Sequence, residues 1–145
     1  MNDLLSALGH AAVYAAAASV LLVVAYYVLD VVTPGHLGSH LCGTDETASS
    51  SAALVAGAWL ISTALVLFTA IWTNGETSLG MALVWTVAFG AFGIVLNTLM
   101  LFLIDAITPG NLRAIVCEPG PVRPLASVAA ATALSVAAIV CASIA

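Results

Sequence analysis

The sequence predicts an all-α, polytopic membrane protein with four transmembrane helices arranged as two parallel two-helix repeats. An extreme apolar composition and an internal duplication lead to this prediction. Of the 145 residues, 63% are hydrophobic and 6% are charged, and the mean hydropathy is +1.18. Soluble domains are about 45–50% apolar and about 25% charged, so the composition excludes them and leaves no room for a separate soluble domain.

Four charge-free apolar stretches each reach the ~20 residues that a helix needs to cross the hydrocarbon core of a bilayer. They cover residues 11–29, 52–72, 79–104 and 125–144. We expect the first to be a retained helix rather than a signal peptide, because the residues before it include an acid and no Lys or Arg. The formal net charge of −5 argues against a nucleic-acid partner and leaves the lipid bilayer as the expected surrounding.

The internal duplication fixes how these stretches are connected. Residues 29–42 read LDVVTPGHLGSHLC and residues 104–117 read IDAITPGNLRAIVC, with six of fourteen positions identical at a spacing of 75. We predict a single membrane domain over residues 1–145, with repeats over about residues 1–74 and about 76–145. Because each repeat crosses the membrane twice, both TPG loops should lie at one face and both termini at the other.

The repeated turn motif is expected to end the first and third transmembrane helices, because Pro lacks an N–H and disfavours the helical conformation of the residue before it. Its residues are Thr33, Pro34, Gly35, Thr108, Pro109 and Gly110. Each Thr should be the N-cap, and each Pro the first residue, of a short amphipathic helix at the membrane interface.

Arg113 and Arg123 are the only basic residues, and both follow the second turn motif. The positive-inside rule therefore predicts that the TPG loops are cytoplasmic and that both termini lie outside. Cys42 and Cys117 occupy equivalent positions and could meet. They should stay reduced in the cytoplasm, whereas a disulfide becomes plausible if the topology is inverted.

Three polar residues within the apolar helices are candidates for a functional site. Asp30 and Asp105 lie near helix ends, where a carboxylate opposes the helix macrodipole. Either they face water and help to cap the following helix, or they line a path for cations or protons. Asn97 lies on the same helix face as Asp105 and could form an interhelical hydrogen bond or line a pore.

The segment after the first turn motif contains His36, His40, Cys42, Asp45 and Glu46, whose spacing could begin a zinc site. The second repeat has an asparagine and an isoleucine at the two histidine positions. We therefore predict no metal site and no cofactor. Because no catalytic motif appears in the chain, we also predict that the protein is not an enzyme.

Small residues predict where the helices approach one another closely, since small faces bring helix backbones together in lipid. They are Gly90 and Gly93 in the third transmembrane helix and Ala126, Ala130, Ala133 and Ala137 in the fourth. Four short helices bury little of one another, so we expect a homo-oligomer.

The twice-repeated Asp-x-x-Thr-Pro-Gly at the end of an apolar helix resembles family 350 of the domains of unknown function. Members of that family are small four-helix bacterial inner-membrane proteins with an internal two-helix repeat. The resemblance covers nearly the whole chain and implies a multi-pass protein of the bacterial cell (inner) membrane. It implies no particular activity.

Two functional hypotheses follow from the sequence. The first is an oligomeric structural or scaffolding component of the bacterial cell membrane that binds a cytoplasmic protein partner through the helices after its TPG turns. The alternative is an oligomeric cation, proton or polyamine channel or transporter lined by Asp30, Asp105 and Asn97.

Overall fold

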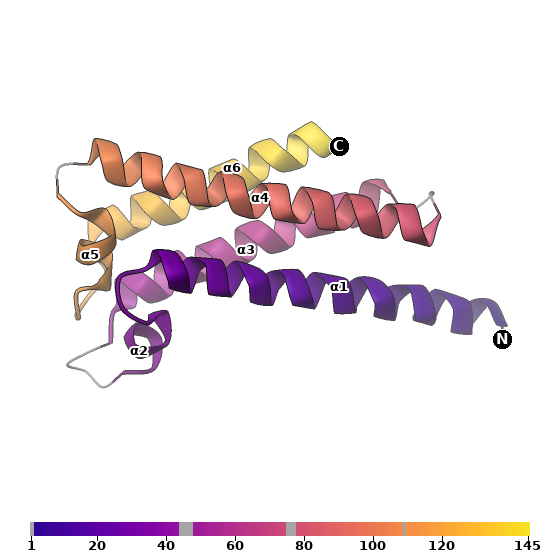
Figure 1. The fold of residues 1–145 in the computed structure, drawn as a ribbon, viewed down its shortest axis with the longest axis horizontal. Coiled ribbons are helices and arrows are strands. Elements are labelled where there is room, and N and C mark those ends of the chain that lie inside the picture. Colours follow the sequence, from indigo (N-terminus) through magenta and orange to yellow (C-terminus); the bar gives the residue numbers. More distant parts are fainter. Residues whose placement is uncertain (1, 44–47, 75–77, 109) are drawn as a thin grey trace.

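The structure, a computed structural model, describes residues 2–43, 48–74, 78–108 and 110–145. These residues form six α-helices: α1 (Asn2–Val32), α2 (Leu37–Cys42), α3 (Ser50–Thr73), α4 (Leu79–Ile107), α5 (Leu112–Cys117) and α6 (Pro124–Ile144). The four long helices run back and forth along one axis, and α2 and α5 lie at one end (Figure 1). All four long helices are long and apolar enough to cross a membrane, which confirms the predicted fold class.

The two ends of the bundle agree with the prediction that each repeat crosses the membrane twice. Both short helices lie at one end of the bundle, and both chain termini lie at the opposite end (Figure 1). The short helices also begin and end at equivalent positions, since Leu37 and Leu112 start them and Cys42 and Cys117 end them.

Helix α3 lies at the centre of the bundle, where it packs most extensively on α6 and also contacts α1 and α4. Its Trp59 is only 1% exposed, and the indole Nε1 donates a hydrogen bond of 3.1 Å to the carbonyl of Ala25 in α1. Helix α1 buries apolar residues only from Leu21 onward, so its first half lies outside the core. Trp59 therefore fastens the packed half of α1 to the centre of the bundle.

Glycine allows α4 to approach both α1 and α3. A Cβ added at Gly90 would lie 2.7 Å from Leu67 Cδ2 and 3.1 Å from Leu21 Cδ1, both closer than carbon atoms normally pack. A Cβ at Gly93 would lie 3.3 Å from Val66 Cγ1. In α6 the predicted alanines are also buried: Ala126, Ala130, Ala133 and Ala137. The small faces predicted from the sequence are thus confirmed as helix contacts.

The two short helices begin three residues later than predicted, so the assignment of Thr33 and Thr108 as their N-caps is wrong. The N-cap positions are occupied by His36 and Asn111. Asn111 caps with its side chain, whose oxygen accepts the N–H of Ala114 at 3.2 Å. His36 makes no side-chain cap hydrogen bond.

Thr33 and Thr108 close the preceding transmembrane helices instead. The N–H and the hydroxyl of Thr33 donate to the carbonyl of Leu29 at 2.9 and 2.7 Å. Thr108 is the C-cap of α4, and its N–H donates to the carbonyl of Ile104 at 3.0 Å. Each threonine thus satisfies a carbonyl that the end of its helix would otherwise leave unpaired.

The delayed start of the short helices has a cause in the backbone. Gly35 and Gly110 have φ angles of +81° and +102°, in the left-handed region that residues with a side chain rarely adopt. A left-handed residue interrupts a helical run, so each short helix can start only after it. Pro109 lies outside the described residues.

Candidate functional site

The end of the bundle that carries α2, α5 and residues 48–51 and 118–123 is here named the loop-end platform. Its two halves are hydrogen-bonded to each other. The buried Ser49 hydroxyl donates to the carbonyl of Val116 at 2.7 Å. Gly120 N–H donates to Ala48 O at 3.2 Å, and Ser50 N–H donates to Gly120 O at 3.3 Å. Segments about 70 residues apart in the chain are therefore joined at this end.

The two aspartates make the same contact in both halves of the chain. Asp30 Oδ1 accepts the N–H of Leu37 at 2.6 Å, and Asp105 Oδ1 accepts the N–H of Leu112 at 2.7 Å. Each carboxylate comes from the last turn of a transmembrane helix and binds the first N–H of the short helix that follows. A helix N-terminus has unpaired N–H groups and a partial positive charge. This is the contact that the capping interpretation requires.

Asp105 has a second partner, which links the two halves of the chain. Arg113 Nε lies 3.0 Å from Asp105 Oδ2, and these side chains are 29% and 14% exposed. Arg113 Nη1 also donates to the carbonyl of Val32, at the end of α1, at 3.2 Å. The guanidinium carbon lies 5.0 Å from the centre of the Phe102 ring. Sequence reasoning used Arg113 only to predict topology, although opposite charges eight residues apart were a signal for this pair.

Asn97 forms an interhelical hydrogen bond, which is one of the two roles considered for it from the sequence. Its Nδ2 donates to Ser62 Oγ in α3 at 2.5 Å, and the Asn97 side chain is 3% exposed. Its Oδ1 is buried without a hydrogen-bond partner among the described residues. Asn97 borders a cavity of about 10 Å³ that Trp59 and Thr132 also line. Such a volume suits about one water molecule. Sequence reasoning did not single out Ser62 or Trp59.

The histidine–cysteine segment borders an open groove of about 410 Å³ on the platform. His40, Cys42 and Cys117 line this groove, and both cysteines are free thiols. His40 Nε2 lies 3.2 Å from the carbonyl of Pro34. Among the described residues, no three histidine, cysteine or acidic side chains are placed to hold a metal ion.

The acidic loop residues Asp45 and Glu46 lie outside the described residues. Glu118, an acidic residue of the platform, forms an exposed ion pair of 2.7 Å with Arg123. An exposed pair of this kind contributes little to stability, typically about 0–1 kcal/mol.

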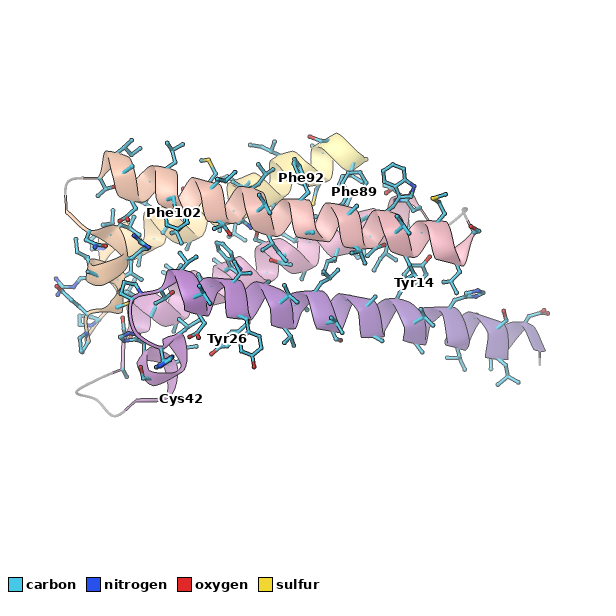
Figure 2. All side chains as sticks on the ribbon, viewed as in Figure 1. Tyr14, Tyr26, Cys42, Phe89, Phe92 and Phe102 are labelled. Carbon is cyan, nitrogen blue, oxygen red and sulfur yellow. The ribbon has the colours of Figure 1, made fainter. Side chains whose placement is uncertain are left out.

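The two platform cysteines should react with alkylating reagents at different rates. Cys42 is exposed (Figure 2), whereas burial raises the pKa of the Cys117 thiol. A raised pKa keeps the thiol protonated to higher pH, and only the thiolate attacks. In detergent at pH 8 we expect Cys117 to be alkylated about tenfold more slowly than Cys42, and the difference to narrow as the pH rises. Mass spectrometry with Cys42→Ser as control measures this, and equal rates at pH 8 would contradict it.

Comparison with known proteins places the chain in a family. No solved structure matches it. It is 32% identical over 119 residues to a "UPF0719 transmembrane protein" of Mycolicibacterium paratuberculosis, a match that covers 82% of this chain and 76% of that protein. The family model described as "Domain of Unknown Function (DUF350)" matches residues 3–144. The chain therefore belongs to the DUF350 family of uncharacterised transmembrane proteins.

Proposed function

We propose that this protein is a non-enzymatic structural component of the bacterial cell membrane, which acts as a homo-oligomer and offers its loop-end platform to a protein partner. The observation that carries the proposal is the use of both aspartates to anchor short helices. Leu37 N–H is bound at 2.6 Å and Leu112 N–H at 2.7 Å. The acids thus serve to order one end of the bundle.

The order of the platform supports a role in recognition. Isolated helices of six residues are not stable in water, so α2 and α5 depend on their anchors. Both helices keep exposed positions, including Ser39 and Ala114. A surface that is already ordered before binding avoids the entropy that a flexible loop loses when a partner docks.

The long helices leave apolar surface for neighbours in the membrane. Of the other long helices, α1 packs on α3 and α4, and its first half is almost entirely exposed. Large apolar side chains also point outward from α4: Met81, Val84, Trp85, Val95, Leu99 and Leu103. We assign these faces to lipid and to further copies of the chain, which a molar-mass measurement in detergent would test. A monomer at all concentrations would count against the oligomer.

A cytoplasmic location of the platform is part of this proposal, supported by the presence of both arginines there. Labelling of the exposed Cys42 thiol measures on which side of the membrane the platform lies. A membrane-impermeant maleimide should label Cys42 in inside-out vesicles and leave it unlabelled in intact spheroplasts. The reverse pattern would place the platform outside.

Site-specific cross-linking tests the partner. A photoreactive amino acid at Ser39 or Ala114, both exposed on the platform, should give one discrete adduct with another protein in intact cells. The control is Ser78, an exposed residue just before α4 at the opposite end of the bundle. Adducts only between copies of this chain, or the same foreign adduct from Ser78, would contradict a partner at the platform.

The channel alternative is less well supported by the geometry within one chain. Asp105 is paired with Arg113, and Asn97 borders a cavity of only about 10 Å³. We expect no cation, proton or polyamine flux in proteoliposomes above that of empty vesicles. Flux that is lost in the Asp30→Asn/Asp105→Asn variant at equal incorporation would instead favour the channel.

A further inference from the structure

In the second half of the chain, Asp105 and Phe102 form a site that is filled by the guanidinium of Arg113. Arg113 provides the cation, Asp105 binds its Nε at 3.0 Å, and the Phe102 ring lies below the guanidinium at 5.0 Å. A carboxylate and an aromatic face are the two groups that commonly hold an organic cation in proteins.

The first half has the same carboxylate and an aromatic residue at the same positions, but it lacks the cation. Asp30 corresponds to Asp105, Tyr27 to Phe102 and Gly38 to Arg113, each at the spacing of 75. A Cβ added at Gly38 would find only the Tyr26 hydroxyl within 4 Å, at 3.9 Å. A side chain could therefore begin at this position in the first half without a clash.

Asp30 keeps one carboxylate oxygen for a further partner. Its Oδ1 accepts the N–H of Leu37, and no ion pair to Asp30 occurs among the described residues. Tyr27 is 62% exposed and lies one helical turn before Asp30, on the same side of α1. A cation at the second carboxylate oxygen would add a charge-assisted contact to the folded state, so its binding should stabilise the fold.

The chain itself cannot supply this cation from a lysine or an arginine. It contains no lysine and two arginines, and both arginines are paired: Arg113 with Asp105 and Arg123 with Glu118. Of the neighbouring histidines, His40 Nε2 lies against the carbonyl of Pro34, and His36 forms no ion pair with Asp30.

We propose that Asp30 and Tyr27, with the open position at Gly38, form a binding site for an external organic ammonium group. The group can come from the headgroup of an aminophospholipid or from a free small amine, because both present the same cation. The site lies in the last turn of α1, at the end where the chain leaves the membrane. This inference does not depend on the proposed platform partner.

The test uses the full chain and two probes. In detergent, ethylammonium chloride is titrated against sodium chloride at equal ionic strength, and the shift in Tm is recorded. In nanodiscs, phosphatidylethanolamine is compared with phosphatidylglycerol, which carries no amine. A shift with ethylammonium, with or without one in phosphatidylethanolamine, shows that a free amine is sufficient. A shift only with phosphatidylethanolamine assigns a lipid headgroup. No shift with either probe overturns the proposal.

Matched variants test whether the amine-induced shift in Tm comes from the proposed site. Asp30→Asn keeps an oxygen for the Leu37 N–H but removes the charge, so the apparent affinity for the amine should fall by about tenfold or more. Tyr27→Leu should weaken the response, whereas Phe102→Leu, its counterpart in the filled site, should leave it unchanged.

The Gly38→Arg variant keeps the test decisive if Asp30→Asn does not fold. It supplies a guanidinium from the position equivalent to Arg113, so it should raise the Tm and abolish the amine response. An undiminished amine response in Gly38→Arg would overturn the proposal.

Discussion

Replacing Trp59 with alanine should lower the free energy of unfolding by about 3 kcal/mol and loosen α1 from the bundle. Trp59 is the largest fully buried side chain of the described residues. Its removal leaves a cavity at the contact of α3 with α1 and eliminates the hydrogen bond to Ala25 O. Unfolding in mixed detergent–SDS micelles, followed by far-UV circular dichroism, measures the loss.

Two further variants separate packing from hydrogen bonding. Trp59→Phe keeps an aromatic ring and most of the side-chain volume but removes the indole N–H, so it should cost less than Trp59→Ala, about 0.5–1.5 kcal/mol. Trp72→Ala is the matched control, because Trp72 is 77% exposed on α3 and stacks only on Phe68. Equal losses from Trp59→Ala and Trp72→Ala would show that Trp59 does not anchor α1.

Replacing Asp105 with alanine should cost about 2–4 kcal/mol, between the values for exposed and fully buried ion pairs. The substitution removes the N-terminal anchor of α5 at Leu112 and leaves the Arg113 guanidinium without its carboxylate. Because Arg113 also binds the carbonyl of Val32, the contact between the two halves should weaken as well.

The equivalent change in the first half provides the control. Asp30→Ala removes only the anchor at Leu37 and should cost about 0.5–2 kcal/mol, the range of a lost helix cap. A double-mutant cycle of Asp105→Ala with Arg113→Ala then isolates the ion pair. A zero coupling energy, or an Asp30→Ala loss as large as that of Asp105→Ala, would contradict a stabilising pair.

The sequence was sufficient to predict the long helices and the placement of the short ones at one end. A backbone in lipid must satisfy its hydrogen bonds internally, so a charge-free stretch of ~20 apolar residues has few alternatives to a helix. The glycine contact at Gly90 was predicted from residue size, and the hydrogen bond of Asn97 to another helix was one of the two alternatives that the sequence left open.

Apart from the small-residue faces of α4 and α6, the buried sides of the helices were not predictable in the same way. Lipid is as apolar as a helix contact, so the hydrophobic pattern of a transmembrane segment does not show which side meets protein. Trp59 and Ser62 therefore looked like any other residues of α3. Their roles depend on Ala25 and Asn97, which lie 34 and 35 residues away in the chain.

The turn motif was predicted at the correct place, but the start of each short helix was predicted three residues too early. Thr and Pro favour a helix start, and Gly35 and Gly110 favour an interruption. The glycine conformation decided the outcome, because its left-handed φ follows the proline directly. The pair of Asp105 with Arg113 arises only when α5 folds back on α4, which local preferences do not specify.

The unequal lengths of the helices determine how the molecule fits a bilayer. Helix α6, with 21 residues, is about 31 Å long and matches a hydrocarbon core of about 30 Å. Helix α1, with 31 residues, is about 46 Å long and extends past the end of α6 at the terminal side (Figure 1). Its excess length carries Asp3, Ser6 and His10, residues suited to the headgroup layer. A thicker or thinner bilayer would therefore change how far the start of α1 is submerged and leave the hydrogen-bonded opposite end undisturbed.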